Sequence, residues 1–380
     1  MALSLFAKKS AAKAESAVSF RTKTAGKPVF AFDFGEYSIK VALLKLRRGE
    51  VEIRNLFTVE NKENLAKLDN QNAKNWRALL QRAFSVRSII PDDHIAVCTF
   101  GGKYYIHRQI EIPYVENAAD RNGVVASEMS QLLALDVNAY VFQHELLSVN
   151  EEKEDGKTCT VWAIAMPKEL CNAVFDLLRG LKMKPMVMDV HANGMKRLLN
   201  ADDSLRKETR GWTVACIDYG MTHTDLLFFN DGTFVNETVL DLGDTQLVQA
   251  ARGAAGTRIT DPTNANKIVA TPQDICNLLN RTHTTAEERA FAQVVKDWLS
   301  KINTAITRFN FDHADSPVRE ILLYGGSPQN FWLAQYVESV VGIPTKLITD
   351  TSLYNTENVA GDEDMDISAY LNVLNLSLMD

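Results

Sequence analysis

The chain has 380 residues, more than one ordinary hydrophobic core supports, so two domains or lobes are expected. Its composition, 46% hydrophobic and 23% charged, excludes an intrinsically disordered chain and is typical of a globular protein. A formal net charge of −7 disfavours nonspecific nucleic-acid binding, which needs clustered basic residues, and we expect no nucleic-acid partner.

The first 28 residues differ in charge from the rest of the chain. They carry six basic residues and one acidic residue, Glu15, in an otherwise acidic protein. Residues 1–28 are therefore predicted to form a basic flexible tail, with contact to anionic lipid as the alternative. No apolar run approaches the roughly 20 residues that a membrane-spanning helix needs, and no cleavable signal is recognised.

A first lobe is predicted over residues 29–112, with residues 191–212 returning to it. β-branched and aromatic residues between turn glycines indicate its strands, and an apolar periodicity indicates one helix. The strands are expected at 29–34, 39–46, 51–57, 95–100 and 104–110, and the helix at 72–84.

A small α/β subdomain is predicted to be inserted over residues 113–190. Two long strands, joined by the charged turn EEKEDGK, lie between two amphipathic helical patterns. Its helices are expected at 118–135 and 168–181, and its strands at 140–149, 158–166 and 185–190.

The second lobe repeats the first. Val214–Glu237 has the layout of Ala31–Asn55: an apolar strand ending in Asp-aromatic-Gly, a polar turn, a strand with a double leucine, a turn glycine and a third strand. Two copies about 185 residues apart indicate duplicated lobes. The second lobe is placed at 213–350, and an acidic loop with a C-terminal helix returning to the first lobe at 351–380. Later helices are expected near 246–254, 272–279, 286–311, 328–341 and 366–378, and strands at 320–324 and 345–348.

The two Asp-aromatic-Gly turns are candidate phosphate-binding elements. A glycine in a tight turn lets backbone N–H groups converge on an anion, and nearby hydroxyls add donors. A carboxylate at the end of the strand holds Mg²⁺ through water, because Mg²⁺ keeps much of its hydration shell. The candidates are Asp33, Gly35 and Ser38 in the first copy and Asp218, Gly220, Thr222 and Thr224 in the second, with Asp33 and Asp218 as the Mg²⁺ residues.

A third candidate element follows the buried strand before residue 325. Gly325, Gly326 and Ser327 open a helix, and paired glycines allow a flat ligand such as a purine to approach the backbone. No P-loop, dinucleotide fingerprint or nucleophile elbow occurs in the sequence. The five cysteines and seven histidines are dispersed, so we expect reduced thiols and no metal cluster.

In this order, the three elements resemble the actin-like ATPase superfamily, and within it the type IV pilus assembly PilM family and its relative FtsA. DFGEYSIKVALLKL resembles the first phosphate motif, IDYGMTHTDLLFFNDG the second, and ILLYGGSPQNFWLAQYVESVVGIP the adenosine motif. The resemblance implies a two-lobed, ribonuclease H-like α/β fold with the small insert, and ATP with Mg²⁺ in the cleft between the lobes. It adds Lys40 to the first phosphate site.

The resemblance also implies partners and a location. It implies a cytoplasmic scaffold at the inner face of the cell membrane, which binds the N-terminal tail of a PilN-like membrane protein near the small subdomain. Pilus motor components and further copies of the chain are additional expected partners.

Four residues depart from the family pattern. Met221 and His223 stand where the family has small residues, His191 stands where it usually has glutamate, and Gly243-Asp244 replaces a glycine pair. Because in-line attack on a phosphate needs a group that positions water, ATP hydrolysis is expected to be slow or absent, and no catalytic residue is assigned.

Other functions are compatible with the sequence. A degenerate, nucleotide-free interaction module is one alternative, and an FtsA-like filament former or a sugar kinase is another. The C-terminal segment Tyr370–Asp380 has no basic residue, which disfavours an FtsA-like membrane helix. No separate catalytic aspartate is recognised for a sugar kinase.

Overall fold

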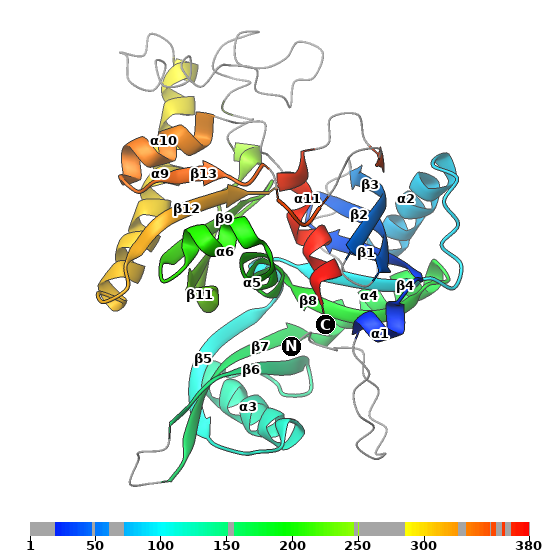
Figure 1. The fold of residues 1–380 in the computed structure, drawn as a ribbon, viewed down its shortest axis with the longest axis horizontal. Helices are drawn as coiled ribbons and strands as arrows, with labels where there is room; N and C mark the ends of the chain where they lie inside the picture. The colour runs from blue at the N-terminus through cyan, green and yellow to red at the C-terminus, as the bar shows by residue number, and fades with distance from the viewer. Residues whose placement is uncertain are drawn as a thin grey trace. The chain divides into compact units, whose positions relative to one another are not determined.

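The structure is a computed structural model that describes residues 20–47, 50–60, 72–150, 156–246, 250, 286–325, 332–349, 351–354, 359–361 and 366–379 (Figure 1). The chain divides into two compact units. The first comprises 1–49, 58–190 and 379–380, and the second comprises 50–57 and 191–378.

Four neighbouring strands of the main sheet lie in the first unit, in the order β2-β1-β4-β8. β1 and β2 form an antiparallel hairpin, β1 pairs in parallel with β4, and β4 pairs in parallel with β8. All residues of β4 and nearly all of β1 are buried, as expected for central strands covered on both faces. The strands are β1 (Pro28–Phe34), β2 (Ser38–Arg47), β4 (Ile95–Phe100) and β8 (Lys184–Val190).

Every second residue along most of β1 is aromatic, so these side chains share one face of the strand and the residues between them lie on the other face. Phe30, Phe32 and Phe34 stack in sequence, and Phe34 also stacks on Phe100 with ring centroids 5.4 Å apart. Because side chains alternate across a strand, Asp33 projects from the opposite face. Helices of this unit are α1 (Phe20–Thr24), α2 (Asn72–Val86) and α4 (Lys168–Gly180), with a 3₁₀ turn, η1, at Gly102–Tyr104.

A second, three-stranded antiparallel sheet of the first unit has the order β5-β7-β6, with helix α3 on one face (Figure 1). Asn117 caps the helix by accepting hydrogen bonds from the N–H groups of Ala119 and Asp120, and Ala134 ends it in the left-handed region at φ 52°. Its core is apolar and includes Ile112, Val125, Met129, Phe142 and Val161. The elements are β5 (Ile106–Pro113), α3 (Ala118–Leu133), β6 (Tyr140–Asn150) and β7 (Thr158–Pro167).

The second unit contains a five-stranded sheet in the order β11-β10-β9-β12-β13. β9 and β10 form an antiparallel hairpin, β9 pairs in parallel with β12, and β12 pairs in parallel with β13. This pattern matches β2-β1-β4-β8 and confirms the predicted duplication. The strands are β9 (Thr213–Tyr219), β10 (Thr224–Asn230), β11 (Thr233–Leu240), β12 (Val318–Tyr324) and β13 (Thr345–Leu347).

One face of this sheet packs against α9 (Ala286–Asp312) and α10 (Trp332–Val341). Ala215, Ile217 and Tyr219 of β9 belong to that core, together with the α9 residues Val295 and Trp298. The intervening β9 residues, Asp218 among them, therefore project from the other face. A smaller parallel pair joins β14 (Ala360–Gly361) to residues 55–56 of β3 (Glu50–Glu60).

Two helices that the sequence analysis did not predict follow β8 in succession. Helix α5 (His191–Ala201) contains Asn193 and Gly194, two residue types with low helix propensity. Both residues are buried, so tertiary packing supports the helix at these positions. α6 (Asp203–Thr209) is capped by Asp202, whose carboxylate accepts hydrogen bonds from the N–H groups of Ser204 and Leu205. The chain ends in α11 (Ile367–Leu374) and a 3₁₀ turn, η3, at Asn375–Leu378, close to the predicted C-terminal helix.

Several sequence expectations differ from the structure or lie outside it. The strand expected from residue 104 begins at Ile106, because Gly102–Tyr104 forms the 3₁₀ turn. Phe20, in the segment expected to be a flexible tail, is a buried residue of helix α1. The helix expected at 272–279 and nearly all of the one expected at 246–254 lie outside the described residues, as do 151–155 of the charged turn, most of the acidic loop and Cys276.

The described cysteines and helices bear on two further expectations. Cys98, Cys159, Cys171 and Cys216 are buried free thiols, in agreement with the absence of disulfides expected for them. Burial raises the pKa of Cys171 to about 11, so this thiol stays protonated at neutral pH. Among the helices that the structure describes, none is both long and apolar enough to cross a membrane.

Candidate functional site

The hairpin of the second unit places two aspartates directly opposite each other. Asp218 on β9 pairs with Asp225 on β10, so both side chains project from the face away from α9. The hairpin loop is two residues long, because Tyr219 pairs with Thr224 and the N–H of Gly220 donates to the carbonyl of His223 at 3.1 Å. Asp218 is 8% exposed and Asp225 1% exposed.

The hairpin of the first unit has the same geometry with a different charge pattern. Asp33 pairs with Lys40, and the N–H of Gly35 donates to the carbonyl of Ser38 at 3.0 Å. Lys40 Nζ lies 3.7 Å from Asp33 Oδ2, so an ammonium group accompanies this buried carboxylate. At the position equivalent to Lys40, the second hairpin has the carboxylate of Asp225.

Glycines are required where the backbone segments of the second unit come close together. A Cβ on Gly220 would lie 2.9 Å from the carbonyl oxygen of His223, and one on Gly243 would lie 2.6 Å from the carbonyl oxygen of Gly220. Gly325 has φ +117°, and a Cβ there would lie 2.6 Å from the carbonyl oxygen of Tyr219 and closer still to Asp218 Oδ1. The turn after β12 therefore lies directly against the Asp218 carboxylate.

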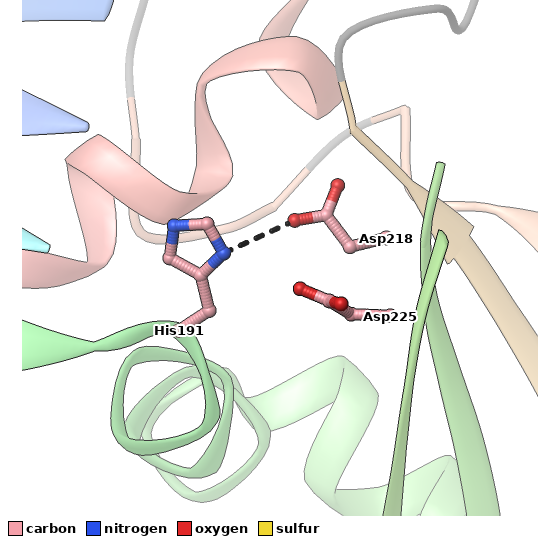
Figure 2. Close-up of side chains that lie close together, drawn as sticks. All are labelled: His191, Asp218 and Asp225. Carbon is pink, nitrogen blue, oxygen red and sulfur yellow. Dashed lines mark ion pairs between the residues drawn. The ribbon is translucent and has the colours of Figure 1, made fainter. Parts of the chain in front are cut away.

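A histidine from α5 completes the cluster. Figure 2 shows His191, at the start of α5, facing the carboxylates of Asp218 and Asp225. His191 Nδ1 lies 3.3 Å from Asp218 Oδ2. One ligand atom from each of the three residues can be chosen so that all lie within 4.8 Å of one another, and all three residues are buried. A second histidine, His223, places Nε2 3.7 Å from Asp225 Oδ2.

Two further buried side chains surround Asp218. Asn372 of α11 donates from Nδ2 to Asp218 Oδ2 at 2.6 Å. Tyr324 pairs with Asp218 across the parallel strands β12 and β9. Burial raises the pKa of the Tyr324 phenol well above its usual range, and the negative charges of Asp218 and Asp225 raise it further. The tyrosine is therefore a neutral hydroxyl at neutral pH.

The structure distributes the predicted site residues between the two units. Asp33, Gly35, Ser38 and Lys40 lie together on the hairpin of the first unit. Asp218, Gly220, Thr222 and Gly325 lie close to one another in the second unit. Gly326 and Ser327 lie outside the described residues.

Thr224 faces away from the other predicted residues of the second unit. Its hydroxyl donates to the carbonyl of Leu242 at 2.7 Å and accepts from the indole N–H of Trp298 at 2.9 Å. Thr224 is fully buried on the α9 side of the sheet, next in sequence to Asp225 on the opposite face. The sequence analysis included it because a hydroxyl follows the turn glycine, but strand alternation points that hydroxyl into the core.

Three residues of the cluster were missing from the predicted site. Asp225 was detectable, because it occupies the repeat position of Lys40, which had been included. His191 is noted in the sequence only as a departure from a family pattern, and no metal cluster is expected there because the histidines and cysteines are dispersed along the chain. Nothing in the sequence pointed to Asn372.

Comparison with known proteins identifies the family of the chain. The family model described as "Type IV pilus assembly protein PilM" matches residues 31–378. A solved structure described as "PilM-PilN type IV pilus biogenesis complex" matches with a TM-score of 0.67 at 17% identity, covering 92% of this chain and 97% of that one. The comparison with curated proteins found no match.

Two other solved structures are similar at lower scores. A Bacteroides thetaiotaomicron protein with an actin-like ATPase fold and unknown function has a TM-score of 0.46 at 8% identity, covering 96% of this chain and 100% of that one. MreB 5 of Spiroplasma citri bound to AMPPNP has a TM-score of 0.43 at 11% identity, covering 84% and 91%. Together with the duplicated sheets, the family match establishes the actin-like α/β fold.

Proposed function

Because this chain belongs to the type IV pilus assembly protein PilM family, we propose that it is an ATP-binding scaffold of a type IV pilus or related secretion machine. In this proposal it works on the cytoplasmic side of the membrane and binds the N-terminal tail of a PilN-like membrane protein. The observation that carries the nucleotide part is the match between the two glycine-closed hairpins, each with a buried aspartate at the same position.

The residues of each hairpin suit a phosphate and its cation. In the second unit, the short loop at Met221 and Thr222 offers backbone N–H groups, and the Thr222 hydroxyl lies 3.0 Å from His223 Nδ1. The carboxylates of Asp218 and Asp225 would repel a phosphate by themselves, so a divalent cation is needed to balance them. In the first unit, Lys40 supplies a positive charge beside Asp33.

When bound, Mg²⁺ would offset the charge of the phosphates, and the buried aspartate of a hairpin, Asp33 in the first unit or Asp218 in the second, is the residue proposed to hold the cation through water. We expect slow or absent hydrolysis. The buried His191 ring lies beside Asp218, with Nδ1 3.3 Å from that carboxylate, where a water molecule for the attack on the phosphate would have to be positioned. The nucleotide would then serve as a stable ligand that regulates partner docking.

The three-stranded sheet of the first unit is the proposed docking site for the PilN-like tail. In the solved PilM–PilN complex those two proteins associate, and we extend a partner of that kind to this chain. β6 is an edge strand of the sheet, with Leu146 and Val149 at 36% and 37% exposure. An extended peptide can add to such an edge through main-chain hydrogen bonds while its side chains contact exposed apolar groups.

Calorimetric titration with Mg·ATP tests the nucleotide part. Asp33→Ala and Asp218→Ala should each abolish or strongly weaken binding, whereas Asp203→Ala, at an exposed position on α6, should bind as the wild type does. Absence of binding to folded wild-type protein at millimolar ATP would refute the ATP-binding proposal and favour a nucleotide-free interaction module.

Peptide binding tests the scaffold part separately. A labelled peptide with the sequence of a PilN-like cytoplasmic tail should bind the wild type, and the double variant Leu146→Lys, Val149→Lys should weaken it at least tenfold. Val340→Lys is a matched control, because Val340 is also exposed, at 47%, but lies on α10 of the second unit. Equal peptide affinity in all three proteins would remove β6 from the docking site.

A further inference from the structure

We propose that His191, Asp218 and Asp225 form a site that coordinates a divalent transition-metal ion directly, with Zn²⁺ as the expected occupant, in the absence of nucleotide. This inference goes beyond the proposed function, which requires only a hydrated Mg²⁺ that arrives with ATP. The two proposals share Asp218, but they are tested by different measurements.

The charges of the two hairpins are the first argument. Across the first hairpin, a buried carboxylate faces an ammonium group, Asp33 opposite Lys40. Across the second, two buried carboxylates face each other, Asp218 opposite Asp225. Like charges directly opposite on neighbouring strands are destabilising, and burial increases the cost. A divalent cation bound by both carboxylates leaves the group electrically neutral when the imidazole is neutral.

The donor atoms identify the class of ion. Imidazole nitrogen suits zinc and other first-row transition metals, whereas Mg²⁺ and Ca²⁺ prefer oxygen donors alone. Three protein ligands of this kind leave a fourth position of a zinc site open to water or to an anion. The separation of 3.3 Å between His191 Nδ1 and Asp218 Oδ2 is close to the roughly 3.3 Å expected between two ligands of a tetrahedral ion with bonds of about 2.0 Å.

The residues around the cluster provide an independent observation. Asn372 donates to Asp218 and is 4% exposed, and its Oδ1 atom has no hydrogen-bond partner in the described part of the chain. The same holds for the hydroxyl of Tyr324, which is 2% exposed and lies beside Asp218 in the strand register. Buried polar atoms without partners are costly, at about 1–3 kcal/mol each. A water molecule bound at the open position of the metal ion would be a hydrogen-bond partner for the Asn372 oxygen and for the Tyr324 hydroxyl.

The structure also fixes the ligands in place before an ion binds. Asn372 holds the Asp218 carboxylate from α11, the Gly325 turn lies against its other oxygen, and His191 is buried at the start of α5. Such hydrogen bonds to a ligating carboxylate orient it, and their loss typically lowers metal affinity by about 10- to 100-fold. Asn372 is therefore assigned a positioning role.

Cobalt titration of the tag-free, chelator-treated full chain tests the site in the absence of ATP. We expect one Co²⁺ per chain, with visible d–d absorption of an ion in a low-symmetry protein site, and displacement by one equivalent of Zn²⁺. His191→Gln and Asp225→Asn should weaken binding at least 100-fold, and Asn372→Ala by about 10- to 100-fold. Asp203→Asn should leave it unchanged, because this carboxylate is exposed on α6 and forms an ion pair with Arg206.

Each result decides the proposal. No Co²⁺ or Zn²⁺ binding by the folded wild type, equal binding by His191→Gln, or displacement of Co²⁺ by millimolar Mg²⁺ as readily as by Zn²⁺ would overturn it. If Asp225→Asn does not fold, the wild-type stoichiometry and His191→Gln still decide. A protein that binds Co²⁺ but not Mg·ATP would support the metal site and refute the nucleotide proposal, and the reverse would do the opposite.

Discussion

Substitution of Gly325 by alanine tests whether the turn after β12 is packed as tightly as the structure indicates. The residue has φ +117°, a conformation that L side chains rarely adopt. Forcing alanine into it costs about 1–3 kcal/mol. The added Cβ would also lie 2.6 Å from the carbonyl oxygen and 2.8 Å from the nitrogen of Tyr219, and against Asp218 Oδ1. Overpacking of this kind adds about 1–3 kcal/mol.

The expected loss in the free energy of unfolding is therefore about 2–6 kcal/mol. Gly342→Ala is the matched control. Gly342 follows the last residue of α10, has φ +74°, and has nothing within 4 Å of an added Cβ. Its replacement carries the conformational cost without the clash, about 1–2 kcal/mol.

Urea unfolding followed by circular dichroism measures both variants, and thermal unfolding provides a second value. Gly325→Ala should be about 1–3 kcal/mol less stable than Gly342→Ala, because only the first has the steric clash. It should also bind Co²⁺ more weakly, since the clash involves the Asp218 carboxylate. Equal stability of the two variants, with cobalt binding retained, would refute the close packing of Gly325 on Asp218.

Three further predictions concern single side chains. Burial and the adjacent guanidinium of Arg108 lower the pKa of His107 to about 4, below its usual 6.5. The stability contributed by its neutral ring is therefore complete above about pH 6.5 and is lost as the pH falls toward 4. Unfolding measured from pH 7 to 4 should show about 1–3 kcal/mol less acid destabilisation for His107→Phe, and parallel pH profiles would contradict this. Thr224→Val should cost about 1–3 kcal/mol, because the buried indole of Trp298 loses its acceptor, while ATP affinity measured by calorimetry should not change. A loss of ATP binding without a loss of stability would return Thr224 to the phosphate site. Asp202→Ala should lower the free energy of unfolding in urea by about 2–3 kcal/mol, because it removes the cap of α6 and two hydrogen bonds from Ser352. A loss below about 1 kcal/mol would show that solvent replaces these bonds.

Local patterns were sufficient for the strands and for the duplication. The apolar run before Asp33 and its counterpart before Asp218 each predict a buried strand, and the glycine two residues later predicts the turn. These signals depend only on neighbours in sequence, so they identify the strands and turns without knowledge of the tertiary packing. Helix α5 was missed for the corresponding reason: Asn193 and Gly194 lower the local helix signal, and burial in the folded chain stabilises the helix instead.

The sequence by itself determined the actin-like fold class and the two aspartate–glycine turns, because strand alternation and turn chemistry are local. Only the tertiary structure decided which side chains meet at those turns. Asn372 reaches Asp218 across 154 residues of sequence, and His191 reaches it because α5 and α11 belong to the same unit as the sheet. Thr224 and Asp225 are adjacent in sequence, and strand alternation places them on opposite faces of the sheet. Only packing shows that Thr224 lies in the core and that Asp225 lies beside His191 and Asp218, where the metal site is proposed.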